Sequence, residues 1–181
     1  SQHVERAVNN KEIQPMIYVM PEGYRTYYVN DFYGEFLYQD MFIKELVPFI
    51  DANYRTLPKK DKRATIGFSM GGFGALILPL KHPEMFSVAV PLSISLRTDD
   101  QYMVEDRKEW DSQWGRLFGG IGLYGKDRIT PYYKGNSPFH LFNKANLKKY
   151  KDLKIYIDNG DDEQTLSKSN EALHILLRDL N

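Results

Sequence analysis

The sequence has 181 residues, the length of one ordinary domain, and its basic and acidic residues balance at 24 each. This balance leaves no bulk positive charge to attract nucleic acid, and no apolar run approaches the roughly 20 residues that a membrane span needs. The absence of cysteine excludes disulfides, thiolate metal sites and a cysteine nucleophile, although it leaves the cellular compartment open.

Hydrophobic spacing predicts the elements of the N-terminal part. The first residues carry neither an initiator methionine nor a secretory signal pattern, and we interpret them as a cut boundary or a mature end. In chain order, we expect a helix from Val4 to about Ile13, a buried strand over residues 16–20, a loop over 24–34, and a long amphipathic helix over 36–54 with a kink at Pro48.

Strands and helices then alternate along the rest of the chain. We expect strands over residues 63–68, 86–92 and 154–158, a glycine-rich helix after Ser69, and a closing helix from about Leu166 to Leu180. Such alternation is typical of a mostly parallel sheet with helices on both faces, joined by right-handed crossovers. The sequence therefore predicts one α/β domain over residues 1–181.

The segment between Ser93 and Asn136 interrupts this alternation and is too long for a plain connection. We interpret residues 94–136 as a cap-like insertion over the strand ends, after which Ser137 and Pro138 start a helix again. Its aromatic residues, Trp110 and Trp114 in particular, are predicted to bind an acyl or sugar group of a substrate. The alternative is a cap whose aromatic residues pack against one another.

A catalytic serine is indicated by the run Gly67-Phe68-Ser69-Met70-Gly71. The motif follows an apolar strand and precedes a helix rich in glycine, which is the setting of a nucleophile elbow. There the serine occupies a strained turn, and small neighbours leave room for its backbone. We therefore predict that Ser69 is a nucleophile, and that the Met70 amide at the helix N-terminus stabilises an oxyanion.

A serine nucleophile needs a histidine base and a carboxylate that orients this base. In this fold the order along the chain is serine, acid, histidine. The turn after the last strand offers Asp161, Asp162 and Glu163 as the acid, because open α/β sheets keep their active sites at the carboxyl ends of the strands. Asp158 is expected to lie within the strand itself.

The histidine base is harder to find. His174 is the only histidine after Glu163, but it lies well inside the closing helix and is interpreted as a structural residue. His140 precedes the acid and His82 directly follows the elbow helix, so both break the expected order. The chain therefore offers no good candidate for the base.

Three segments of the chain resemble the putative esterase family of the α/β-hydrolases: residues 15–21, residues 45–55 and the elbow itself. This family includes feruloyl and acetyl-xylan esterases, S-formylglutathione hydrolase, enterochelin esterases and mycolyltransferases. The turn at 157–163 is similar to the family's acid turn, where the spacing after Gly160 selects Glu163 and the residue type favours Asp162.

Two departures from the family pattern concern the catalytic groups. The resemblance implies earlier strands with a His-Gly-containing loop that donates a second oxyanion amide, and a later Gly-His segment that carries the base. Neither is found in these 181 residues. We therefore expect an α/β-hydrolase fold that is truncated at both ends and nearly inactive as it stands.

The resemblance implies a serine carboxyl-ester hydrolase that uses no metal or cofactor. Its expected substrates are feruloyl or acetyl esters of plant polysaccharide, or related small acyl esters; neither nucleic acid nor a membrane is expected as a partner. An acyltransferase of the same fold and a non-catalytic carbohydrate-binding relative are the alternatives.

Overall fold

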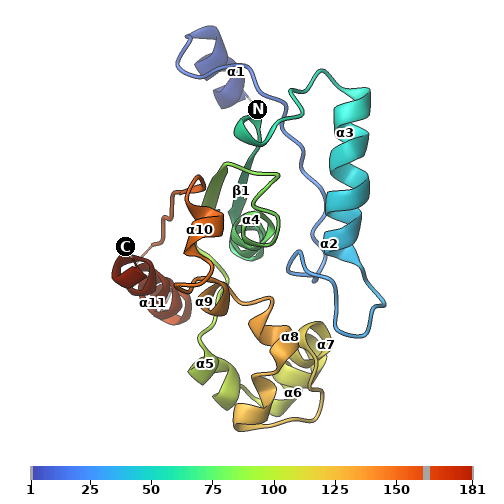
Figure 1. The fold of residues 1–181 in the computed structure, drawn as a ribbon, viewed down its shortest axis with the longest axis vertical. Helices are drawn as coiled ribbons and strands as arrows, with labels where there is room; N and C mark the ends of the chain where they lie inside the picture. The colour runs from blue at the N-terminus through green and yellow to red at the C-terminus, as the bar shows by residue number, and fades with distance from the viewer. Residues whose placement is uncertain (1, 161–163, 181) are drawn as a thin grey trace.

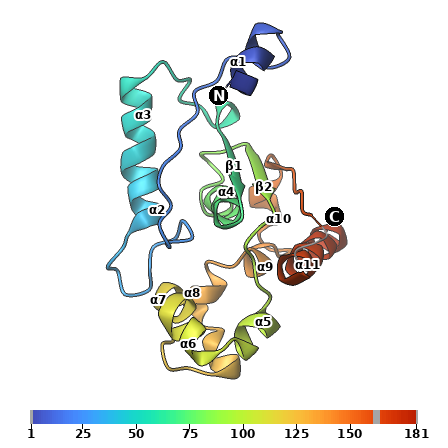
Figure 2. The ribbon, with the colours of Figure 1, turned by 180° about the vertical axis from the view of Figure 1, so that it is seen from behind.

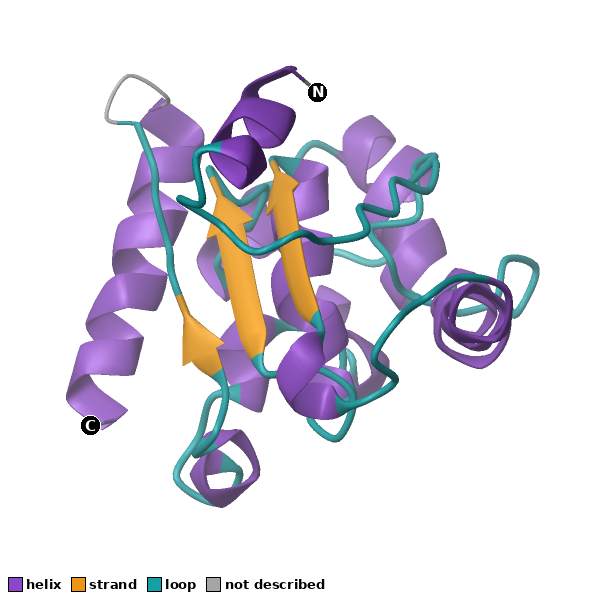
Figure 3. Cartoon of the chain, turned by 90° about the horizontal axis from the view of Figure 1, so that it is seen from above, coloured by secondary structure: helices purple, strands orange, loops and turns teal. Residues whose placement is uncertain are grey.

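The computed structural model describes residues 2–160 and 164–180, and within these it contains a three-stranded parallel sheet. The strands are β1 (Ala64–Phe68), β2 (Val88–Leu92) and β3 (Lys154–Ile155), in the order β1-β2-β3 (Figure 3). Phe68 lies opposite Leu92, and a bridge between Leu92 and Asp158 continues the pairing beyond β3. The parallel sheet with intervening helices confirms the predicted α/β class.

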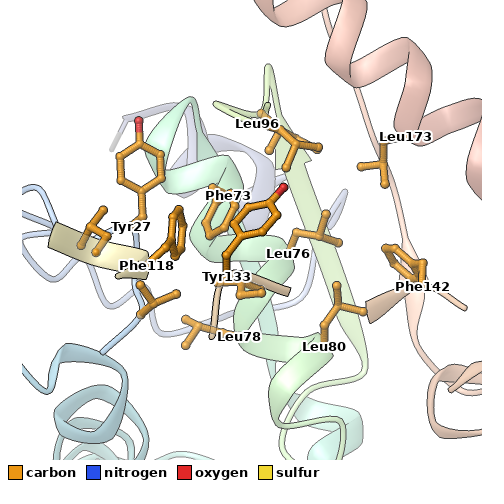
Figure 4. Packing of buried hydrophobic residues seen from close by; sticks show 14 of the residues in the cluster. Tyr27, Phe73, Leu76, Leu78, Leu80, Leu96, Phe118, Tyr133, Phe142 and Leu173 are labelled. Atoms are coloured by element: carbon orange, nitrogen blue, oxygen red, sulfur yellow. The ribbon is translucent and has the colours of Figure 1, made fainter. Parts of the chain in front are cut away.

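Helix α4 (Met70–Lys81) packs against β1 and β2 and is buried nearly all round. Its residues Gly72 to Leu80 are all buried, which is typical of a central helix rather than an amphipathic surface helix. Figure 4 shows Phe73 beside Tyr133 and Phe118, and Leu80 toward Phe142. The core therefore lies around α4, between the sheet and the helices of the second half of the chain.

The predicted helix over 36–54 forms in three parts. It comprises α2 (Tyr38–Met41), a π-helical turn (Phe42–Leu46) and α3 (Val47–Asn53), and it stands along one side of the molecule in Figure 1. Pro48 has no N–H to donate to the carbonyl one turn earlier, so it breaks the regular hydrogen-bond ladder. The irregularity expected at Pro48 thus takes the form of a π-helical turn.

Both terminal helices agree with the sequence-based expectation within a few residues. Helix α1 (Gln2–Asn9) is shorter than predicted, and none of its residues is buried. Helix α11 (Gln164–Leu180) runs beside the β3 edge of the sheet (Figure 3), and its Leu173 belongs to the core.

The strand predicted at residues 16–20 is absent, and this prediction is wrong. The segment is extended but pairs with no described strand, and its side chains are exposed, up to 91% for Met20. On β1, which is an edge strand here, Ile66 and Phe68 are 66% and 65% exposed. An apolar run becomes a buried strand only where a neighbouring strand supplies hydrogen-bond partners for its backbone N–H and C=O groups. No described segment supplies them here.

The second half of the chain contributes short helices. Those between β2 and β3 are α5 (Asp99–Val104), α6 (Arg107–Glu109), a π-helical turn (Trp110–Trp114), α7 (Gly115–Phe118), a 3₁₀ turn (Gly125–Arg128), α8 (Pro131–Lys134), α9 (Pro138–Leu141) and α10 (Leu147–Tyr150). Figures 1 and 2 show α5 to α8 gathered beyond the carboxyl end of β2. Helix α9 begins at Pro138 as predicted, but the Ser137 hydroxyl donates to the Tyr133 hydroxyl instead of capping α9.

A buried arginine organises the part of the insertion around α5. Arg128 is 1% exposed, and its guanidinium donates to the carbonyl oxygens of Leu123, Tyr102 and Glu105 at 2.7–2.9 Å. It also lies 4.7 Å from the ring centroid of Trp110. These contacts satisfy backbone acceptors that would otherwise be buried without a donor.

We predict that Arg128→Met lowers the free energy of unfolding by about 3 kcal/mol, because it leaves buried carbonyl groups without donors. Urea unfolding checks this value. Arg178→Met is the matched control, since Arg178 is exposed and, among the described residues, forms an ion pair with its neighbour Asp179 alone. Equal stability of the two variants would contradict the role given to Arg128.

Gly74 provides a second test of packing around α4. A Cβ on Gly74 would lie 2.3 Å from the Tyr28 ring, so we predict that Gly74→Ala destabilises the fold by roughly 1–3 kcal/mol despite alanine's better helix propensity. Gly135→Ala is the control, because Gly135 has helical dihedrals and its nearest neighbour is 3.5 Å away. Thermal melts of both variants measure the difference; a Gly74→Ala melt as high as that of the control would exclude the close contact.

Candidate active site

Ser69 occupies the junction between β1 and α4 in a strained conformation. Its φ and ψ are 56° and −117°, a region that residues with a side chain rarely adopt. The Ser69 amide donates to the Leu92 carbonyl at 3.0 Å, and the Ser69 carbonyl accepts from the amides of Phe73 and Ser95. The turn is therefore held by the neighbouring strand, by the helix and by the segment after β2.

Close backbone contacts explain the glycines around Ser69. A Cβ on Gly67 would lie 2.1 Å from the carbonyl oxygen of Gly71, and a Cβ on Gly72 would lie 2.6 Å from that of Leu92. Any side chain at these positions would push the helix away from the strands. The glycines thus make possible the sharp turn that displays Ser69.

The loop over residues 22–28 covers the first turns of α4. The Tyr28 ring packs against Gly74, and its hydroxyl lies near Gly23 and the side chain of Met70. The Tyr38 hydroxyl donates to the Glu22 carbonyl, and burial, with smaller contributions from neighbouring tyrosines, raises the pKa of Tyr38 to about 12. Both tyrosines are therefore neutral at ordinary pH.

The Met70 amide lies at the first position of α4, directly after the Ser69 turn. An amide at this position has no acceptor within its own helix, and none is found for it among the described residues. The N-terminus of a helix of this length also carries partial positive charge. The geometry can therefore offer a donor to an anionic oxygen bound next to Ser69.

A network behind Ser69 was not foreseen from the sequence. The Tyr27 hydroxyl and the Ser95 hydroxyl share a hydrogen bond of 3.0 Å, and the Ser95 amide donates to the Ser69 carbonyl. Both Tyr27 and Ser95 are buried. Strand register is the only signal in the sequence that could have indicated Ser95. Ser93 follows β2 as Ser69 follows β1, and Ser95 lies two residues further along the chain.

The candidate acids Asp161, Asp162 and Glu163 lie outside the described residues. Asp158, just before them, bridges to Leu92 and accepts from the Ser93 amide through its backbone carbonyl at 2.8 Å. The strand pairing therefore brings the chain to the Ser69 edge of the sheet three residues before the first of these carboxylates.

None of the described histidines forms a hydrogen bond with the Ser69 hydroxyl. His174 is exposed on α11, and His82 follows α4 with its Nδ1 3.5 Å from Glu84. His140 is bound to both carboxylate oxygens of Asp99 through its Nε2, at 2.9 and 3.0 Å. Asp99 also accepts from Tyr133, so His140 belongs to a network that joins α5 to α8 and α9.

Trp110 and Trp114, predicted to bind substrate, are 0% and 2% exposed. Both pack edge-to-face on Tyr102, and Trp114 stacks on Phe118. These contacts correspond to the alternative of a self-packed insertion, and neither side chain presents surface to a ligand in this structure.

The described residues form neither a metal-binding cluster nor a membrane-spanning helix. Among residues 2–160 and 164–180 there is no group of three or more acidic or histidine side chains that could hold a metal ion. Within the same residues, no helix combines the length and apolar character needed to cross a bilayer.

Comparison with known proteins identifies the family of this chain. Residues 1–177 match the family model described as Putative esterase. The chain is 42% identical over 124 residues to Esterase Rv1288 of Mycobacterium tuberculosis, covering 62% of this chain and 25% of that protein. It is 31% identical over 109 residues to an endo-1,4-beta-xylanase/feruloyl esterase of Xylanibacter ruminicola, covering 59% and 14%. The chain thus spans a quarter or less of the length of these relatives.

Solved structures show the same fold at low identity. A ferulic acid esterase superimposes with a TM-score of 0.70 at 20% identity, over 99% of this chain and 64% of the other. MPT51 of Mycobacterium tuberculosis superimposes with a TM-score of 0.67 at 16% identity, over 88% and 62%. The family match over nearly the whole chain and the shared fold lead to one conclusion: this chain belongs to the putative esterase family and has an incomplete α/β-hydrolase fold.

Proposed function

We propose that this chain carries the nucleophile of a serine carboxyl-ester hydrolase, with Ser69 as that nucleophile. The observation that carries the proposal is the left-handed conformation of Ser69 at a strand-to-helix turn. Strain of this kind costs on the order of 1–3 kcal/mol and is found mostly where function requires it. A serine that served only to start α4 would gain nothing from it, and its side chain makes no capping hydrogen bond.

The reaction follows from the position of Ser69 beside a helix N-terminus. The Ser69 hydroxyl attacks the ester carbonyl, and the carbonyl oxygen becomes an oxyanion that accepts from the Met70 amide. A histidine takes the serine proton, oriented by Asp162 or Glu163. None of the described histidines forms a hydrogen bond with the Ser69 hydroxyl, and we propose that the base is a histidine outside these 181 residues.

The proposed substrates are feruloyl or acetyl esters of plant polysaccharide, or related small acyl esters. One relative is an endo-1,4-beta-xylanase/feruloyl esterase and one structural neighbour is a ferulic acid esterase, and both support this choice. Transfer of the acyl group to a sugar hydroxyl would use the same acyl-enzyme. Product analysis with and without a sugar acceptor separates transfer from hydrolysis.

Ser69→Ala is predicted to abolish hydrolysis of 4-nitrophenyl acetate and methyl ferulate by the full protein, with a loss of at least about a thousandfold in kcat/KM. Ser87→Ala is the matched control, because Ser87 lies at the opposite, amino end of β2. Unchanged hydrolysis by the Ser69→Ala variant would refute the nucleophile.

The chain of 181 residues alone is expected to be nearly inactive, and turnover by it at the rate of the full protein would mean that one of its own histidines is the base.

Met70→Pro tests the proposed oxyanion donor. Proline is well accepted at the first position of a helix, but it removes the amide hydrogen. We predict a loss of roughly 100- to 1,000-fold in kcat, with Met70→Ala within a fewfold of the parent protein because it keeps the amide. Circular dichroism confirms that both variants fold. Similar kcat values for the two variants would exclude the Met70 amide as a donor.

A further inference from the structure

A second serine lies in register with Ser69 on the neighbouring strand. Phe68 pairs with Leu92, so Ser69 and Ser93 are the residues that directly follow β1 and β2 at the carboxyl edge of the sheet. Ligands of open α/β sheets bind at this edge. Ser93 is therefore a direct neighbour of the proposed nucleophile, on the side from which Asp158 approaches.

Ser93 shares the unusual backbone of Ser69. Its φ is 41°, in the left-handed region where glycine is the ordinary choice. A non-glycine residue in this region costs about 1–2 kcal/mol. Glycine at this position would remove this cost. The turn alone therefore does not explain why the residue has a side chain.

Hydrogen bonds hold the backbone at Ser93 and at the two residues that follow it. The Ser93 amide donates to the Asp158 carbonyl, and the Ser95 amide donates to the Ser69 carbonyl. Between them, the side chain of Asn170 from α11 pairs with both the amide and the carbonyl of Ile94, at 3.2 and 2.9 Å. Strained residues that are determined in this way cluster at functional sites.

The Ser93 hydroxyl has no structural task that would explain its presence. It makes no hydrogen bond to any described residue, and Ser93 is only partly buried. By contrast, the hydroxyl of Ser95 is buried and bonded to Tyr27. The two serines of this segment therefore differ: the Ser95 hydroxyl is bonded to Tyr27, and the Ser93 hydroxyl is available to a ligand.

We infer that Ser93 is a substrate-positioning residue whose hydroxyl donates a hydrogen bond to the alcohol oxygen of the ester. This inference rests on the proposed function. As the Ser69 oxygen bonds to the carbonyl carbon, the bond between this carbon and the alcohol oxygen breaks, and the departing oxygen takes the proton that the base removed from Ser69. Ser93 stabilises the negative charge that gathers on this oxygen before the proton arrives.

The test varies the alcohol part of the substrate in the full protein. Ethyl acetate releases a weakly acidic alcohol that needs the hydrogen bond, whereas 4-nitrophenyl acetate releases a stable phenolate that does not. Ser93→Gly and Ser93→Ala are expected to lower kcat/KM for ethyl acetate by about three- to tenfold, the value of one hydrogen bond, and for 4-nitrophenyl acetate by less than about twofold. Ser93→Gly should also melt at a higher temperature than Ser93→Ala, because glycine relieves the strained φ.

The outcomes separate this inference from the proposed function. Ser87→Ala, just before the amino end of β2, should leave both rates unchanged. Equal losses on the two esters would show a structural role for Ser93 and overturn the inference, as would unchanged rates in a protein that still needs Ser69. Hydrolysis that is absent, or that does not depend on Ser69, would overturn the proposed function and this inference with it.

Discussion

The close approach of two backbones at the β1–α4 junction is the constraint on which the candidate site depends. The Gly67 Cα faces the Gly71 carbonyl, and the Gly72 Cα faces the Leu92 carbonyl, with no space for a Cβ in either place. This contact forces the chain to reverse within one residue, and that residue is Ser69. The cost of its left-handed φ is offset by burial of α4, which contributes most of its length to the core.

The same contact determines what the rest of the molecule must supply. Helix α4 is apolar on all sides, so it needs cover beyond the sheet, and the insertion after β2 provides part of it through Phe118 and Tyr133. The aromatic residues of the insertion are thus used for packing, and Arg128 serves the backbone carbonyls among them. The insertion lies beyond the strand ends (Figure 1), so this packed body stays close to the carboxyl edge of the sheet without exposing Trp110 or Trp114.

Features encoded locally could be predicted from the sequence. The elbow, β1, β2, α4 and α11 were found because periodicity and the glycine spacing are properties of short segments. The strand expected at residues 16–20 failed because a strand depends on its neighbour, which hydrophobicity does not reveal. The burial of Trp110 depends on contacts with Arg128 and Tyr102, and the position of Ser93 beside Ser69 depends on strand register; both are tertiary properties.

The three-residue segment 93–95 links the proposed nucleophile to the proposed acid. Its first amide is bonded to Asp158, which precedes Asp161, and its middle peptide is held by Asn170, which follows Glu163 on α11. Its last amide is bonded to Ser69. The described chain on both sides of the candidate acids is therefore anchored to the segment that holds Ser69. Loosening α11 would consequently disturb the segment that holds Ser69, so the docking of α11 contributes to the geometry of the candidate site and not only to stability.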